Sequence, residues 1–140
     1  MSDVKSKIQS AFSERQLAVL ATINEEGKPW VRYVMLNAND DLTIRFATFA
    51  ASRKVAHIEK NPEVHMTCGA TALNATRHYM QIQGKAEVSN DPSEKNAYWN
   101  DGLNAYFEGP EDPNMRVVII KPYRIEYQTM GSKEPEVWSA

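Results

Sequence analysis

Phe46-Ala-Thr-Phe-Ala-Ala-Ser-Arg-Lys-Val-Ala-His-Ile-Glu-Lys-Asn-Pro62 joins the end of a predicted strand to a predicted helix. Apolar residues at 42, 44 and 46 alternate with polar or small ones, which is typical of a half-buried strand ending near Thr48. Beyond Ser52 the apolar residues follow helical spacing, and Pro62 ends the segment because the residue before a proline avoids the helical region. Ser52 is therefore the predicted N-cap.

The first turn of this helix carries two cations, Arg53 and Lys54, and no Asp or Glu lies between residues 47 and 58. A helix start is electropositive and has unpaired N–H groups, so each cation there costs about 0.3–1 kcal/mol. A bound anion would reverse this effect, because the hydroxyls of Thr48 and Ser52 and both cations would converge on it. The segment is thus a candidate phosphate site. The alternative is that both cations simply point into solvent.

Length and composition favour one domain spanning residues 1–140 in a cytoplasmic protein. The formal net charge is −2 without a run of Lys or Arg, which gives no reason to expect nucleic acid or an anionic membrane as a partner. The single cysteine, Cys68, excludes an intrachain disulfide and fits a reducing compartment. The first residues contain no long apolar run, so no signal peptide or membrane span is expected.

The rest of the chain reads as short strands with a few helices. The patterns predict an N-terminal helix within residues 1–15, a helix from Asp91 to about Trp99 and a further short helix around residues 103–107. Strands are expected at 17–23, 30–36, 64–67, 78–88, 116–121 and 123–129, the last two split by Pro122, and the tail 129–140 has no clear pattern. This clustering of strands favours a mainly β fold, an antiparallel barrel of six or seven strands with flanking helices.

The motifs of Rossmann sites, P-loops, α/β-hydrolases and zincins are absent, and the histidines with Cys68 do not have the spacing of a metal site. His57 is expected to be a partly exposed helix residue. Tyr79, Gln81 and Gln83 share one face of the 78–88 strand and could contact a planar heteroaromatic ring. The alternative for these three residues is an exposed sheet face.

Arg32 is the one charged residue in an otherwise largely apolar strand, where a buried cation needs an anionic partner. It either supplies such a contact or faces solvent, and the pattern leaves both open. If Arg32 and the Ser52 turn hold a phosphate while the Tyr79 face meets a ring, the ligand is of the flavin mononucleotide (FMN) type.

Several stretches, taken in order, resemble the pyridoxamine 5′-phosphate oxidase-like FMN-binding split barrels, and most closely their general stress protein branch. They are Leu17-Ala-Val-Leu-Ala-Thr, Gly27-Lys-Pro-Trp-Val-Arg-Tyr-Val-Met35, the Thr48 to Pro62 corner, Tyr79 to Val88 with its Gly-Lys-Ala-Glu, and the loop from Trp99 to Pro113. The likeness covers roughly residues 10–128.

The resemblance implies a homodimeric split barrel with two FMN sites at the subunit interface and, as the expected activity, an FMN-dependent oxidoreductase of unknown substrate. Carried over by position, four residues would bind the phosphate, Thr48 would sit beside it, Val34 and Met35 would line the isoalloxazine, and Tyr79 would approach the flavin or its ribityl chain. The four phosphate-binding positions are Arg32, Ser52, Arg53 and Lys54.

The chain also departs from the oxidases it resembles. Asn37 stands where they place a lysine, the last arginine is Arg124, so the arginine-rich C-terminal segment is missing, and Gln128 replaces a tryptophan. These differences predict that the protein does not oxidise pyridoxamine 5′-phosphate. Two alternatives stay open: flavin binding without turnover, in a carrier or stress-related role, and another phosphorylated cofactor such as a deazaflavin or a haem-related ligand.

Overall fold

The computed structural model describes residues 3–140. Its elements in chain order are α1 (Asp3–Ala11), β1 (Gln16–Ile23), β2 (Pro29–Ala38), β3 (Ile44–Phe49), α2 (Arg53–Lys60), β4 (Glu63–Cys68), β5 (His78–Ser89), α3 (Pro92–Tyr98), the 3-10 helix η1 (Asp101–Ala105), β6 (Met115–Thr129) and β7 (Glu136–Ser139).

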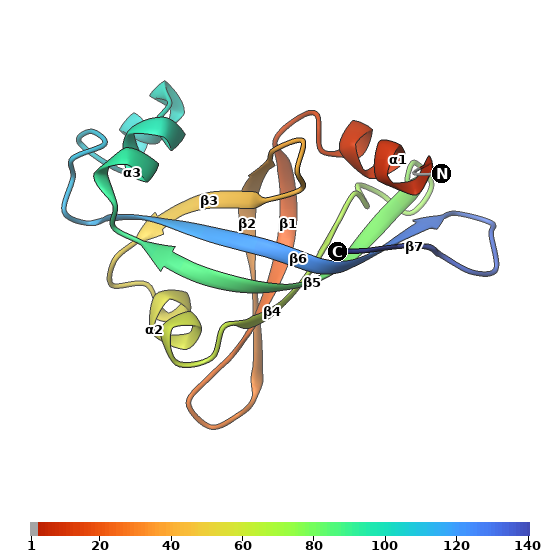
Figure 1. The fold of residues 1–140 in the computed structure, drawn as a ribbon, viewed down its shortest axis with the longest axis horizontal. Coiled ribbons are helices and arrows are strands. Elements are labelled where there is room, and N and C mark those ends of the chain that lie inside the picture. The colour runs from red at the N-terminus through yellow and green to blue at the C-terminus, as the bar shows by residue number, and fades with distance from the viewer. Residues whose placement is uncertain (1–2) are drawn as a thin grey trace.

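Six of the strands form a closed antiparallel barrel (Figure 1). The strand order is β3-β2-β1-β4-β5-β6-β7, and a second pairing of β3 with β6 closes the ring. β7 lies outside the ring as an extra strand on β6. The predicted mainly β, antiparallel barrel with flanking helices is therefore confirmed.

The barrel interior is filled by the alternate, inward-facing residues of its strands. Leu20, Leu36, Ile44, Ile82 and Ile120 are fully buried there. On β5 the predicted division is correct, because Met80, Ile82 and Ala86 face the core whereas Gln81, Lys85 and Glu87 are exposed. Each buried aliphatic side chain contributes about 1.5–3 kcal/mol of transfer free energy.

Helices cover the two ends of the barrel, and a third lies against its outer face. α1 adds Ile8 and Phe12 to the barrel core at one end, and α2 adds Ile58 at the other. α3 and η1 pack outside on β3 and β6, where a second apolar cluster forms around Phe107, Met115 and Val117 (Figure 1). The Asp91 N-cap of α3 forms as predicted, since its carboxylate accepts the Ser93 N–H at 2.9 Å.

The prediction that Pro122 divides two strands is wrong, because β6 runs unbroken from residue 115 to 129. The register with β5 shifts between Gln83 and Gly84, so that Gly84 faces Pro122 and Tyr123 is an extra residue. On its other side, β6 pairs with β3 up to Ile120 and with β7 only from Arg124 onward. Pro122 thus lies where β6 pairs with neither β3 nor β7. Its missing N–H therefore costs no hydrogen bond to either strand.

Three other boundaries also differ from the prediction. The tail is not without structure, because residues 136–139 form β7 and pair with residues 124–127. Helix α1 ends at Ala11 rather than at residue 15, while residues 1 and 2 of that predicted helix lie outside the described residues. The short helix expected around residues 103–107 is a 3-10 turn over 101–105.

Within residues 3–140, no helix has the length and apolar character needed to cross a membrane.

Candidate functional site

The turn between β3 and α2 has the predicted geometry, with one difference. Ser52 is the residue before the helix, and its extended backbone (φ −63°, ψ 142°) starts the first turn. Its hydroxyl does not cap the helix; instead it accepts a hydrogen bond from Lys54 Nζ at 2.9 Å. The same ammonium donates to Thr48 Oγ1 at 2.9 Å. Lys54 therefore brings both hydroxyls together at the helix start, so three of the predicted site residues are in contact.

Arg32 reaches this corner from β2. It pairs with Leu20 of β1, so its side chain is on the inner face near the end of the barrel, half-buried. Its Nη1 donates to Thr22 Oγ1 at 2.7 Å and to the carbonyl oxygens of Trp30 at 3.0 Å and Leu20 at 3.3 Å. The guanidinium is thus fixed by neutral oxygens. The alternative of a solvent-facing Arg32 does not hold.

Arg53 completes a cluster of three cations. Its guanidinium lies over the Trp30 ring, 5.1 Å from the centroid, and the residue is exposed. Burial lowers the pKa of Arg32, and the neighbouring Arg53 lowers it further. Burial likewise lowers the pKa of Lys54, with a second contribution from Arg32. The alternative that Arg53 and Lys54 both point into solvent therefore holds for Arg53 only.

The positive charge of this cluster is not neutralised by the described part of the chain. In residues 3–140, the ion pairs within 4.0 Å are Lys7–Glu136, Arg45–Glu94, His57–Glu25, Lys85–Glu63 and Arg124–Glu126. None of these involves Arg32, Arg53 or Lys54, so residues 3–140 supply no carboxylate to the corner. An anion would offset both the mutual repulsion of the cations and the desolvation of two of them.

Next to the corner is a cavity of about 300 Å³ lined by residues of both β2 and β3. Thr48 and Lys54 line it together with Val34 and Met35, so four of the predicted site residues meet at this cavity. The remaining walls are mainly aromatic, with one further cation, and they comprise Arg15, Tyr33, Ala47, Phe49, Tyr98, Leu103, Tyr106 and Phe107. Aromatic walls of this kind are typical of sites for flat rings, and Lys54 adds a cation at one side of the cavity.

Tyr79 is not brought to this cavity within one chain. It stands at the start of β5, paired with Gln128 and packed against Gly69. Gln81 and Gln83, from the same face, line a separate polar hollow of about 310 Å³ with His65, Arg124 and Glu126. The assignment of Tyr79 to the flavin therefore stays a prediction, and within the described chain the polar face is separate from the corner.

Sequence reasoning missed Thr22, which accepts a hydrogen bond from Arg32, and His57, which lies against Thr22. His57 is 6% exposed rather than partly exposed, and its Nδ1 lies 2.9 Å from Thr22 Oγ1, the oxygen that accepts from Arg32. The Thr22 hydroxyl therefore links the Arg32 guanidinium to the His57 ring. The available signal was the alternation of β1, where Thr22 falls on the same inner face as Ala18 and Leu20.

No cluster of three or more His, Cys, Asp or Glu side chains within residues 3–140 has the arrangement of a metal site.

Comparison with known proteins identifies the family. Residues 4–129 match the family described as pyridoxamine 5′-phosphate oxidase. General stress protein 26 of Bacillus subtilis (strain 168) is 33% identical over 133 residues, covering 95% of this chain and 94% of that protein. Matches to curated pyridoxine/pyridoxamine 5′-phosphate oxidases span only about a third of those longer proteins.

Solved structures agree with this assignment. The general stress protein 26 of Bacillus anthracis str. Sterne superposes with a TM-score of 0.82 at 30% identity, covering 98% of both chains. A pyridoxamine 5′-phosphate oxidase-related, FMN binding protein from Nostoc punctiforme PCC 73102 shares the fold, with a TM-score of 0.69 at 17% identity over 96% of this chain and 82% of that one. The chain therefore belongs to the pyridoxamine 5′-phosphate oxidase family, in which it is similar to general stress protein 26.

Proposed function

We propose that this protein binds FMN and acts as an FMN-dependent oxidoreductase. The observation that carries the proposal is the cluster of three cations, without a carboxylate partner in residues 3–140, beside a cavity with aromatic walls. A phosphate on a flat aromatic group matches both features. The FMN binding protein of the same fold adds support by analogy.

In this proposal, Lys54, Arg53 and Arg32 hold the phosphate, and the hydroxyls of Thr48 and Ser52 donate to it. Thr22 and His57 keep the Arg32 guanidinium oriented. Val34 and Met35 line the ring, whose chemistry is the transfer of electrons between a donor and a substrate. The protein contributes position and electrostatics.

We further propose that the cavity is completed by a second copy of the chain, whose Tyr79 approaches the flavin. The outer face of β1 and β2 supports this idea, because its apolar side chains are largely uncovered: Leu17 is 58%, Val31 62%, Tyr33 71% and Met35 43% exposed. Tyr33 and Met35 also line the cavity, so a partner seated on this face would close the cavity as well as bury apolar surface.

The test is the visible spectrum of the purified protein before and after addition of FMN, followed by NADH or NADPH without oxygen. Bound flavin bands that bleach support the oxidoreductase. Bands that persist with either donor favour flavin binding without turnover. No flavin bound at saturating FMN rejects the proposal, and mass spectrometry of a ligand released from the protein then distinguishes a deazaflavin or haem-related group.

A further inference from the structure

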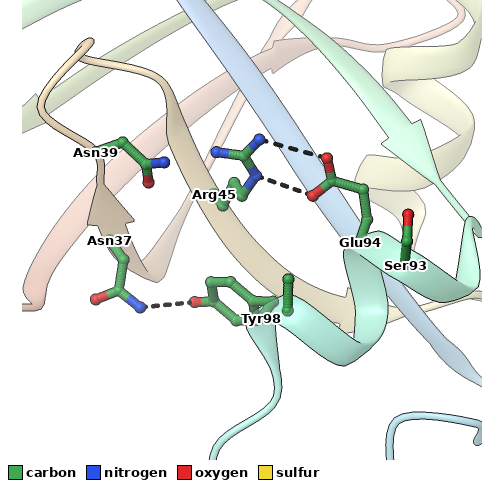
Figure 2. Close-up of a pocket in the computed structure, with 7 residues that line it drawn as sticks. Asn37, Asn39, Arg45, Ser93, Glu94 and Tyr98 are labelled. Atoms are coloured by element: carbon green, nitrogen blue, oxygen red, sulfur yellow. Dashed lines mark hydrogen bonds and ion pairs between the residues drawn. The ribbon is translucent and has the colours of Figure 1, made fainter.

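A second cavity, of about 490 Å³, lies beside the candidate FMN site, between the β2–β3 turn region and α3 (Figure 2). Most of the residues that line it have polar side chains, and they come from β2, β3, the turn between them and α3: Asn37, Asn39, Arg45, Ser93, Glu94, Ala97 and Tyr98. Tyr98 also lines the 300 Å³ cavity. One side chain therefore contributes to both spaces, and a molecule in the polar cavity would be a neighbour of a bound ring.

The polar cavity is electrically neutral, unlike the corner at Lys54. Its two charged residues form a bidentate pair, in which Arg45 Nε lies 3.0 Å from Glu94 Oε1 and Nη2 lies 3.4 Å from Oε2. Their side chains are only 23% and 27% exposed. An anionic ligand would have to compete with Glu94 for the guanidinium, and a cationic ligand with Arg45 for the carboxylate. Either competition leaves a half-buried charge without its partner, which is costly.

Several hydrogen-bonding groups in the cavity remain available to a ligand. Asn37 Nδ2 donates to the Tyr98 hydroxyl oxygen at 3.3 Å, so the hydrogen of that hydroxyl is free to donate elsewhere. In Figure 2, Arg45 Nη1 points away from Glu94 on the side of Asn39. Neither Nη1 nor the Asn39 amide has a hydrogen-bond partner in residues 3–140. The cavity thus offers donors for an oxygen atom and amide oxygens for an N–H group.

We propose that this polar cavity is the substrate pocket of the flavin site, and that it accepts uncharged molecules bearing a carbonyl or amide group and rejects phosphorylated or carboxylated ones. The proposal rests on the proposed function and adds a substrate class to it. A carbonyl oxygen would accept from Tyr98 and Arg45, and an amide N–H would donate to Asn37 or Asn39. Burial raises the pKa of Tyr98, which keeps the hydroxyl protonated as a donor.

A matched pair of probes tests the charge rule. Nicotinamide and nicotinate have nearly the same size and differ in charge, and both can be titrated into the isotope-labelled full-length protein, with and without FMN. Nicotinamide is expected to shift the side-chain amide signals of Asn37 and Asn39 and the Nε–H signal of Arg45. Nicotinate at the same concentrations is expected to leave them in place.

Glu94→Gln should reverse this preference, because it removes the carboxylate that neutralises Arg45. We expect nicotinate to bind this variant about tenfold more tightly than it binds the wild type, since charge-assisted hydrogen bonds are roughly twice as strong as neutral ones. Glu87→Gln is the control, because it makes the same change at an exposed position of β5. Asn39→Leu, which alters an exposed turn residue, provides a second variant and should weaken the nicotinamide-induced shifts of the remaining Asn37 and Arg45 signals.

FMN affinity separates the two proposals, because Glu94 does not line the 300 Å³ cavity. Equal FMN affinity in wild type and Glu94→Gln, together with the switch in probe preference, supports the pocket assignment. Absence of nicotinamide shifts, or equal binding of both probes to the wild type, overturns it whether or not FMN binds. Nicotinamide shifts in a protein that does not bind FMN overturn the flavin site and the substrate role, while the neutral pocket stands.

Discussion

Lys54 holds the anion corner together, because its ammonium donates to both Thr48 and Ser52. Burial, and to a lesser extent the proximity of Arg32, lowers its pKa, so holding the ammonium at this position costs free energy. Under the proposed function, the bound phosphate would offset that cost, a trade-off that is typical of functional sites.

Replacing Arg53 and Lys54 together by alanine is expected to weaken FMN binding by about 2–4 kcal/mol, through loss of charge-assisted hydrogen bonds. The fold should persist, because neither side chain belongs to the barrel core. Quenching of flavin fluorescence on binding measures the affinity, and circular dichroism checks the fold. Lys60→Ala, an exposed lysine at the other end of α2, is the control. FMN affinity equal to that of the wild type would show that the corner does not hold the phosphate.

Cys68 is buried, and this burial raises the pKa of its thiol to about 12 from 9.0. At pH 8 only about one molecule in 10⁴ carries the thiolate, so the native protein should resist alkylation by iodoacetamide until it is denatured. The free energy of unfolding should be insensitive to this group below pH 9.0 and fall between pH 9.0 and about 12, because only the unfolded chain ionises there. Mass spectrometry of timed alkylation measures the first effect; rapid labelling of native protein would contradict it.

A residue's role could be predicted from the sequence where neighbouring residues in the chain reveal its environment. The Ser52 corner was predictable because a strand end, a helix start and uncompensated charge lie within a few consecutive residues. Arg32 was ambiguous because a period-two pattern identifies two faces without saying which one is inside. His57 was misjudged because α2 packs against β1 and β5, where its hydrogen-bond partner Thr22 lies 35 residues away in the sequence, and no local pattern reveals such contacts.

At the scale of elements, the long strand β6 continues across Pro122 because the facing residue of β5 leaves room for the proline ring. Gly84 makes this possible, since a Cβ atom there would lie 2.8 Å from Ile120 Cγ2, 3.1 Å from the Lys121 carbonyl oxygen and 3.3 Å from Pro122 Cα. The proline ended the predicted strand because sequence alone does not show the opposing glycine. β7 was missed for a similar reason, because a four-residue strand has too few positions to show alternation and depends on β6 for its pairing.

Gly84→Ala is therefore expected to destabilise the protein by about 1–3 kcal/mol, because two of the three close contacts are with backbone atoms that cannot easily move. Urea denaturation of the protein measures the difference. Gly109→Ala is a matched control, since a Cβ atom there meets nothing within 4 Å. If both variants unfolded at the same urea concentration, the close packing of β5 on β6 at this point would be in doubt.

At the scale of the molecule, the exposed apolar face of β1 and β2 predicts a dimer. Val31→Glu places a charge on that face without touching the 300 Å³ cavity. We expect the wild type to have the mass of a dimer by light scattering and Val31→Glu that of a monomer with reduced FMN affinity. Leu73→Glu, at a fully exposed loop position, should keep the wild-type mass. A monomeric wild type would rule out a site completed by a second copy.

The closing of the barrel also sets an order of events during folding. β3 joins β6 through pairs such as Ile44 with Ile120 and Phe49 with Met115, which are far apart in the chain, whereas β1 and β2 form a local hairpin. Long-range pairing is slow because the loop between its partners must first lose entropy. The anion corner directly follows β3, which pairs with β2 at only two residues and with β6 at six, so its position depends mainly on the β6 pairing. Under the proposed function, FMN binding during refolding should therefore begin when β3 pairs with β6. The time course of FMN binding would report the closure of the barrel rather than the formation of the local β1–β2 hairpin.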